Sequence, residues 1–395
     1  MLIFDITQGY DKDIYNKSIQ EIKNLENSDN TVLASLILNI SNKCNYKCIY
    51  CYANYGNYGR ANELMSLQTL KKIISELKIN GIKNIEVVEL FGGEPTINEN
   101  LSDIVSTIYK NFDVNHFLIT TNGSASDELI KELIDYPVLF HVSIDGPEEI
   151  NDSLRGKGSF AKAINFIKIL KDNKIPYKLS TTYTHLHEQC NISYDDLYEF
   201  SKKIGSDIEV STVIVDNNSN LKVESIVDEE YLNRELNRTI DVIKNNELAI
   251  NLDPYIIRIL KAFLLSIKSS GFCDDLNCSN SLNYDYDGSK YNCFKLWSDS
   301  RFKLEDFSTN EILNVCNDKN NFSQCSSCTF KYMCELCVAD TILGNEEIPF
   351  INGICYKKKR YDLALDKIIE TIENGDIVNI QKNFVNYILW GFLCT

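Results

Sequence analysis

Hydrophobic residues follow two alternating patterns from about residue 34 onward. One pattern is a short run rich in β-branched and aromatic residues, typical of a buried strand, and it occurs at Leu33–Ile40, Ile85–Phe91, His116–Thr121, Val138–Ile144, Tyr177–Tyr183 and Ile208–Ile214. The other has a helical period, and it occurs at Ser66–Ile79, Asn100–Lys110, Asp127–Asp135, Ser159–Asp172 and Tyr194–Ile204. Six successive β–α units predict an α/β fold with a parallel sheet and right-handed crossovers.

The pattern changes in the second half of the chain. We expect helices at Glu229–Asn246 and Pro254–Ser269, and after them a segment, residues 273–355, in which hydrophobic periodicity fades. Such a segment cannot bury a large apolar core, so its closely spaced thiols indicate that metal holds it together. Lys357–Ile372 is a further predicted helix, and Phe384–Leu393 is a short apolar tail that we expect to pack on the body.

Composition narrows the class of protein. A chain of 395 residues with 44% hydrophobic residues and six prolines predicts two folded domains, or one large barrel with an appendage. The net charge of −16 disfavours nucleic acid as a partner; the acidic surface either solvates the protein or steers a basic peptide toward it. Apolar runs are of strand length and the N-terminus lacks the features of a signal peptide, so we expect a cytoplasmic protein without a membrane span.

Fourteen cysteines are the most informative feature of the composition. Three fall between Cys44 and Cys51 and nine between Cys273 and Cys355, whereas Cys190 and Cys394 stand alone. In a reducing cytosol, clustered cysteines of this kind indicate metal binding or catalysis rather than disulfides.

The first cluster, Cys44, Cys48 and Cys51, has the spacing C-x3-C-x2-C and follows the first predicted strand directly. Three thiolates can bind three irons of a [4Fe–4S] cubane and leave the fourth iron open for chemistry. Zinc is the alternative, but it needs a fourth ligand, and the nearest histidine is His116. Active sites of parallel α/β proteins lie on the loops that follow the strands, which is where this triplet falls.

This spacing, with Tyr50 directly before the third cysteine, resembles the radical S-adenosylmethionine superfamily. The resemblance implies that the open iron binds the methionyl amine and carboxylate of S-adenosylmethionine, and that cleavage gives a 5′-deoxyadenosyl radical that abstracts a hydrogen atom. It also implies that Tyr50 packs near adenine, although an ordinary core aromatic residue fits the position too.

Three further segments resemble the same superfamily in the same order. Gly92, Gly93, Glu94 and Pro95 match a motif that binds the methionyl amine, where glycines allow close backbone approach and the carboxylate offers a charged acceptor. Two more pairs are implied to bind the cofactor: Thr121 and Asn122 on the ribose side, and Ser143 and Arg155 at the methionyl carboxylate. A simple turn is the alternative for the first pair, and a surface salt bridge is the alternative for Arg155.

The later cysteines resemble the SPASM extension of peptide-modifying members of that superfamily, which carries two auxiliary [4Fe–4S] clusters. The resemblance implies that auxiliary cluster I is bound by Cys273, Cys278, Cys293 and Cys337. It implies that auxiliary cluster II is bound by Cys325, Cys328, Cys334 and Cys355. The spacings around Cys273 and Cys337 depart from the family pattern, so cluster I could keep an open iron. We interpret Cys316, Cys190 and Cys394 as thiols outside the clusters, and a pair of zinc sites is the alternative for the whole segment.

The hydrophobic pattern and the resemblance together imply a partial (β/α)6 TIM barrel with a C-terminal, cysteine-rich, iron–sulfur SPASM domain. The expected divisions are an N-terminal extension (1–33), a radical SAM partial barrel (34–228), a helical linker (229–271), the SPASM domain (272–360), and a C-terminal helix and tail (361–395).

The resemblance also suggests a reaction. The stretch from Cys51 to Gly59 is similar to maturases of small cysteine-rich peptides, of the sactipeptide and ranthipeptide type, so we expect a Cys thioether crosslink within a cysteine-containing precursor peptide. The rival is oxidation of a Cys or Ser to formylglycine, as in sulfatase maturation, but there an aspartate follows the matching cysteine, whereas Phe294 and Lys295 follow Cys293 here. A non-catalytic electron carrier would not explain the three-cysteine motif.

Two partners follow from the same resemblance. Cluster reduction needs an electron donor such as a flavodoxin or a ferredoxin. Many such maturases recognise a leader peptide through a domain of about eighty residues before the barrel, and the roughly 33 residues that precede the first predicted strand are too few for it. Leader binding would then need a separate protein, use a remnant of the domain, or be absent.

Overall fold

The structure of the chain is a computed structural model. It describes residues 31–213, 229–246, 252–264, 271–273, 281–297, 299–305, 311–335, 337–343, 350–351, 354–376, 379–380 and 382–384.

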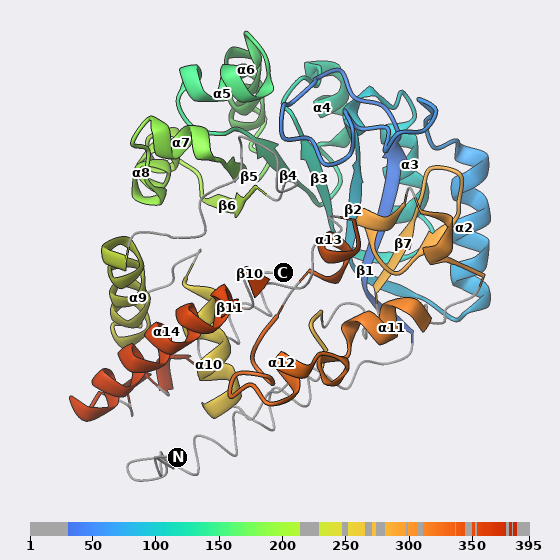
Figure 1. Ribbon diagram of the computed structural model, residues 1–395. Helices are drawn as coiled ribbons and strands as arrows, with labels where there is room; N and C mark the ends of the chain where they lie inside the picture. Colours follow the sequence, from blue (N-terminus) through green and yellow to red (C-terminus); the bar gives the residue numbers. More distant parts are fainter. Residues whose placement is uncertain are drawn as a thin grey trace.

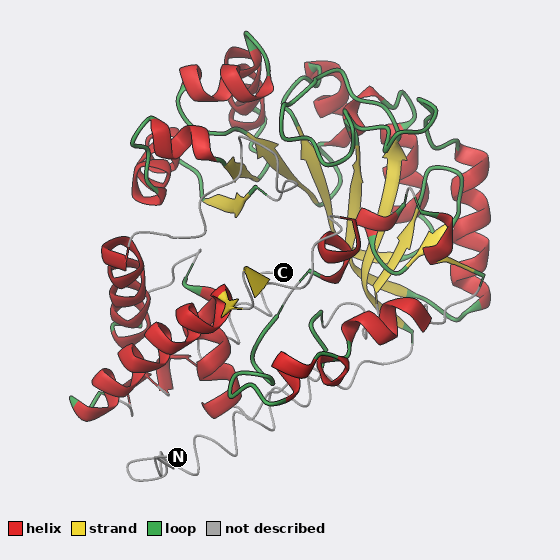
Figure 2. Cartoon of the chain, in the orientation of Figure 1, coloured by secondary structure: helices red, strands yellow, loops and turns green. Residues whose placement is uncertain are grey.

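A curved sheet forms the centre of the fold (Figures 1 and 2). Its first six strands are parallel neighbours in chain order, as the hydrophobic pattern predicts: β1 (Val32–Ser41), β2 (Asn84–Gly92), β3 (Asp113–Thr121), β4 (Val138–Ser143), β5 (Tyr177–Tyr183) and β6 (Ile208–Thr212). The predicted partial barrel is therefore confirmed. The last residue expected in β6, Ile214, lies outside the described residues.

Helices cover the outer face of this sheet (Figure 2). The five predicted ones are present as α2 (Leu67–Ile79), α3 (Leu101–Tyr109), α4 (Asp127–Leu133), α6 (Ser159–Asp172) and α8 (Tyr194–Ile204). In α2 the buried residues are Leu70, Ile73, Ile74 and Leu77, which is the spacing of one helical face. The side chain of Ser66 accepts a hydrogen bond from the Thr69 N–H and so begins this helix.

Two short helices lie among these elements without having been predicted. They are α5 (Glu148–Arg155), after β4, and α7 (His185–Gln189), after β5. Both follow the carboxyl ends of strands, the edge at which parallel α/β proteins place their active sites.

A separate group of helices forms a second apolar core (Figure 1). The expected helices are confirmed as α9 (Glu229–Lys244), α10 (Pro254–Leu264) and α14 (Tyr356–Glu373). Tyr361 of α14 packs edge-on against Tyr255 of α10, with ring centroids 4.6 Å apart. Residues 265–269 of the second helix and 385–393 of the expected tail lie outside the described residues, whereas Phe384 is buried in this core.

The cysteine-rich segment extends the central sheet, which the sequence pattern did not predict. β7 (Ser281–Tyr284) pairs parallel with β1, and β8 (Lys290–Tyr291) and β9 (Lys303–Leu304) continue the sheet antiparallel. The other short elements of the segment are η3 (Phe294–Leu296), η4 (Ser300–Phe302), α11 (Glu311–Asn317), η5 (Lys319–Asn321), α12 (Ser323–Ser326), α13 (Val338–Leu343), β10 (Phe350–Ile351) and β11 (Ile354–Cys355).

A third apolar cluster joins this segment to the barrel. Trp297 is fully buried. Its ring centroid lies 5.6 Å from that of Tyr58, on the first cysteine loop, and 6.2 Å from that of Phe91, on β2. One cysteine of the first triplet, Cys51, therefore packs against the same cluster as several later ones, namely Cys273, Cys293, Cys316, Cys325 and Cys337. Cys328 and Cys334 pack against the second core instead. The domain boundaries expected from the sequence stay predictions. In the part of the chain that the structure describes, no helix is long and apolar enough to cross a membrane.

Candidate active site

The first cysteine triplet lies on the loop that leaves the carboxyl end of β1 (Figure 1). Cys44, Cys48 and Cys51 are free thiols, each partly buried. The pKa of Cys44 is raised to about 11 and that of Cys48 to about 12, mainly by burial and to a smaller extent by the neighbouring thiols. The three thiols are therefore close enough to influence one another, in surroundings that disfavour bare thiolates unless a cation is bound.

This donor set fits an iron–sulfur cubane, because each thiolate of a cubane binds a different iron and the sulfurs need not converge on one point. Within the described residues, no three His, Cys, Asp or Glu side chains are placed to hold a single metal ion. The ligand assignment stays a prediction.

The loop folds back tightly on itself after the third cysteine. Asn54, Tyr55 and Tyr58 adopt left-handed backbone conformations, with φ of 46°, 60° and 53°, which are strained for tyrosine. A Cβ at Gly56 would lie 2.6 Å from both Cys44 Cβ and Gly93 Cα, so only glycine lets the backbone pass here.

The Gly92–Pro95 segment packs directly against the start of that loop. A Cβ at Gly93 would lie 2.3 Å from the Lys43 carbonyl oxygen, and the Glu94 N–H donates to the same oxygen at 2.9 Å. Pro95 begins the short helix η1 (Pro95–Ile97) and is buried. The residues predicted to bind the methionyl amine are thus brought next to the predicted cluster ligands.

Glu94 is a buried carboxylate with a full set of local donors. Oε1 accepts from the Thr121 hydroxyl at 2.7 Å and from the N–H and hydroxyl of Thr96 at 3.1 and 2.7 Å, and Oε2 accepts from the Asn122 N–H at 2.7 Å. Burial raises the pKa of Glu94, and these hydrogen bonds oppose that rise. Asn122 also donates to Asn45 on the cysteine loop at 2.8 Å. The structure therefore brings Glu94, Thr121 and Asn122 together.

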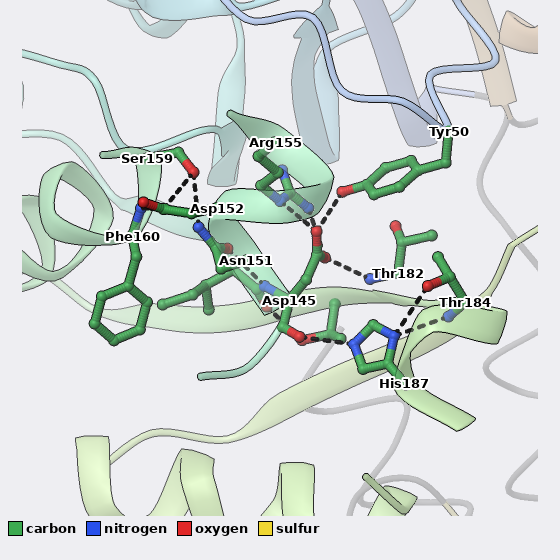
Figure 3. A network of polar contacts seen from close by, with 12 residues as sticks. Tyr50, Asp145, Asn151, Asp152, Arg155, Ser159, Phe160, Thr182, Thr184 and His187 are labelled. Carbon is green, nitrogen blue, oxygen red and sulfur yellow. Dashed lines mark hydrogen bonds and ion pairs between the residues drawn. The ribbon is translucent and has the colours of Figure 1, made fainter. Parts of the chain in front are cut away.

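Arg155 does not form a surface salt bridge. It is 8% exposed and donates from Nε and Nη2 to the two carboxylate oxygens of the fully buried Asp145, at 2.7 and 2.9 Å (Figure 3). The Tyr50 hydroxyl donates to the same carboxylate at 2.7 Å, and the Tyr50 ring lies 5.5 Å from the guanidinium carbon. Burial, and to a smaller extent the Asp145 carboxylate, raise the pKa of Tyr50. Ser143, the other predicted carboxylate ligand, ends β4 and is partly exposed.

Charges from these residues reach the triplet. The pKa of Cys44 is raised by Glu94, while that of Cys48 is lowered by Arg155 and raised by Asp145, each a smaller effect than burial. Glu94 and Arg155, two of the residues predicted to bind the cofactor, thus lie near the cysteines predicted to bind the cluster.

Several of the later cysteines lie close enough to influence one another electrostatically. The pKa of Cys293 is raised to about 12, first by burial and then by Cys337 and Cys273. The pKa of Cys325 is raised to about 11 by burial and by three neighbouring thiols, those of Cys334, Cys355 and Cys328. Cys278, the remaining predicted ligand of cluster I, lies outside the described residues.

The cysteines left outside the predicted clusters differ in exposure. Cys190 is exposed and Cys316 is partly buried. Cys394 lies outside the described residues.

Sequence reasoning missed several residues around these sites. Asp145 lies two positions after Ser143, and its partners Arg155 and Tyr50 lie 10 and 95 positions away from it in sequence. Lys295 was noted only for not being an aspartate, yet its ammonium lies 3.6 Å from Cys337 Sγ. No local sequence signal could have found either contact.

Comparison with known proteins supports this description. The family model described as "Radical SAM superfamily" matches residues 38–200. The chain is 28% identical over 120 residues to GTP 3′,8-cyclase of Clostridium perfringens (strain SM101 / Type A), covering 30% of this chain and 36% of that protein. It is 29% identical over 122 residues to the cysteine-type anaerobic sulfatase-maturating enzyme of Clostridium novyi (strain NT), covering 28% and 32%. These matches span about a third of the length of the curated relatives.

Solved structures resemble a much larger share of the chain. Native anSMEcpe with bound AdoMet and Kp18Cys peptide has a TM-score of 0.63 at 19% identity, and covers 89% of this chain and 99% of that one. Streptococcus suis SuiB bound to precursor peptide SuiA has a TM-score of 0.51 at 18% identity, and covers 83% and 76%. At these identities the likeness shows the fold.

The barrel, the cysteine loop at its carboxyl edge and the family match point to one class of protein. Residues 38–200 match the radical SAM superfamily, and the fold of the chain, with its cysteine-rich C-terminal region, is similar to that of the solved structures named above.

Proposed function

We propose that this enzyme is a peptide maturase that forms an intrapeptide Cys thioether. The observation that supports the proposal is the electrostatic influence of Cys337 and Cys273 on Cys293, and of Cys334, Cys355 and Cys328 on Cys325, within a fold shared over most of its length with structures that hold a peptide. Cys273, Cys278, Cys293 and Cys337 would bind one auxiliary cluster, and Cys325, Cys328, Cys334 and Cys355 the other.

The residues around the triplet have distinct proposed tasks. Cys44, Cys48 and Cys51 would bind the catalytic cluster, and Glu94, Ser143 and Arg155 would bind the amine and carboxylate of S-adenosylmethionine. Tyr50, Thr121 and Asn122 would line the adenosine side, with Gly92, Gly93 and Pro95 allowing close approach. When bound, the cluster and cofactor together supply a 5′-deoxyadenosyl radical.

The rival function is oxidation of a Cys or Ser to formylglycine, and the match to a sulfatase-maturating enzyme favours considering it. We prefer the thioether because Phe294 and Lys295 follow Cys293, and an ammonium that contacts a cysteine sulfur cannot act as a carboxylate base. A flavodoxin or ferredoxin as electron donor, and a cytoplasmic location, stay predictions.

Substrate-dependent cofactor cleavage tests this function. The reconstituted enzyme, with dithionite and S-adenosylmethionine, should form 5′-deoxyadenosine faster when a cysteine-containing precursor peptide is added, and a Cys→Ala version of that peptide should give no crosslinked product. Cleavage that is indifferent to every peptide, or peptide products that keep all their thiols, would contradict the proposal.

A further inference from the structure

Every polar atom of Asp145 has a partner, although the residue is fully buried (Figure 3). Beyond its bonds to Arg155 and Tyr50, Oδ1 accepts from the Thr182 N–H at 2.9 Å. The backbone N–H of Asp145 donates to Asn151 Oδ1 at 2.9 Å, and its carbonyl oxygen accepts from His187 Nε2 at 2.8 Å. A buried carboxylate is costly unless it is bonded in this way, so the arrangement is a built site.

These partners come from separate parts of the barrel. Asp145 itself follows β4, two partners lie on α5, and the others come from the cysteine loop, β5 and α7. One carboxylate and its peptide group therefore fix the relative positions of five elements at the carboxyl edge of the sheet.

His187 holds the backbone of Asp145 in one orientation. Its Nδ1 accepts from the Thr184 N–H at 3.0 Å, so Nε2 carries the proton that is donated to the Asp145 carbonyl. The imidazole is fully buried and stacks on Tyr183, with ring centroids 4.9 Å apart. Neither the peptide group nor the carboxylate of Asp145 can then turn without breaking several contacts.

The pairing also decides which edge of Arg155 is available. Nε and Nη2 face Asp145, and Nη1 takes no part in these two bonds. A ligand carboxylate can bind Nη1 while the pair stays intact, because a guanidinium offers donors on more than one edge.

We propose that Asp145 is a positioning residue: it orients Arg155 to receive the carboxylate of S-adenosylmethionine and holds Tyr50 against that arginine, so that cofactor binding and the cysteine loop are coupled. The proposal rests on the proposed function, in which Arg155 binds that carboxylate.

The decisive variant is Asp145→Asn in the full-length, anaerobically reconstituted enzyme. The amide keeps the volume but places an NH₂ group where one oxygen accepts from Tyr50 and Arg155, so donors face a donor. Calorimetry should show S-adenosylmethionine binding weakened about tenfold or more. Binding of 5′-methylthioadenosine, which has no carboxylate, should be unchanged. Equal weakening of both ligands indicates a merely structural role and overturns the proposal, as does unchanged S-adenosylmethionine affinity.

Tyr50→Phe tests the proposed coupling between Arg155 and the cysteine loop without removing a charge. It serves as the test of the positioning role if Asp145→Asn does not fold. It deletes one hydrogen bond to the carboxylate, so S-adenosylmethionine binding should weaken by roughly a few fold, with iron content retained. Binding of 5′-methylthioadenosine, which reports direct contact of Tyr50 with the adenosine side, should be unchanged. Unchanged affinity for S-adenosylmethionine would contradict the coupling.

Asp152→Asn is the matched control. The Asp152 carboxylate lies on α5, the helix that also carries Arg155. It accepts hydrogen bonds from the N–H groups of Gly158 and Phe160 and from the Ser159 hydroxyl, and these bonds do not include Arg155. The Asp152→Asn control should lower the stability of the protein and leave S-adenosylmethionine affinity unchanged. A loss of affinity equal to that of Asp145→Asn would assign the effect to general damage.

The wild-type enzyme separates failure of the proposed function from failure of the positioning role. If the wild-type enzyme does not bind S-adenosylmethionine, the proposed function fails. If it binds and the Asp145 and Tyr50 variants bind equally well, only the positioning role fails.

Discussion

The cysteine loop after β1 and the cysteine-rich segment after β7 hold their thiols by different physical means. The loop is attached to a barrel whose apolar core includes residues from all six parallel strands, and it is pinned by glycines and by hydrogen bonds to Gly92–Glu94. The segment consists of elements of two to seven residues, and its cysteines contribute to its small apolar cluster. We therefore expect that the barrel can fold without metal and that the segment depends on its thiols being bound.

The largest expected effect is the loss of chemistry when the first site is removed. Anaerobic reconstitution should give about twelve irons per chain, from three cubanes. The Cys44/Cys48/Cys51→Ala variant should lose about four of these and all reductive cleavage of S-adenosylmethionine, while the barrel keeps its fold. Iron assay and chromatographic detection of 5′-deoxyadenosine measure this, and cleavage that persists would refute the assignment.

The next largest effect concerns the difference in stability between the barrel and the cysteine-rich segment. Cys334→Ala should release about four irons and speed amide exchange throughout residues 311–335, with exchange in β1 to β4 unchanged. Hydrogen-exchange mass spectrometry measures both regions at once. Cys190→Ala, at an exposed thiol, is the matched control and should change neither. Equal protection in the segment with and without its metal would show that its thiols are not structural.

A smaller effect is expected inside the metal-independent barrel. Arg155→Ala leaves the Asp145 carboxylate buried without its cation, which should lower the free energy of unfolding by about 3–5 kcal/mol. It should also weaken S-adenosylmethionine binding about ten- to a hundredfold with iron content unchanged. Denaturant unfolding and calorimetry measure these. Lost iron would mean that the arginine supports the cluster loop instead.

The smallest effect is a pH dependence of the barrel. Burial lowers the pKa of His141 on β4 to about 4. Between its ordinary value of 6.5 and about 4 the unfolded chain binds a proton that the folded chain does not, so stability falls as pH falls through this window. His141→Gln should flatten that part of the curve of stability against pH. An identical slope in the variant would show that other groups dominate it.

The same contrast explains what the sequence could predict. Strands and helices of the barrel follow a clear period, and their observed bounds lie within a few residues of the expected ones, with β5, α6 and α8 identical. β7 could not be found, because it has four residues and pairs with β1, a strand far away in sequence. Local patterns do not contain such pairings.

The candidate site likewise contains residues that the sequence could locate and a contact that it could not. Motif spacing located the cysteines, Glu94 and Arg155, and the structure brings them together around the end of β1. The partner of Arg155 could not be inferred, because a carboxylate ten residues away on another element becomes its neighbour only through the turn from β4 into α5.

The mass of the modified peptide tests the central claim most directly. With a cysteine-containing precursor peptide, S-adenosylmethionine and a low-potential reductant, the product should lose two hydrogens per crosslink, one from sulfur and one from carbon, and its linked cysteine should resist thiol alkylation. Formylglycine formation instead replaces the sulfur with a carbonyl oxygen. A product that carries an aldehyde in place of its cysteine would contradict thioether formation and establish the rival oxidation.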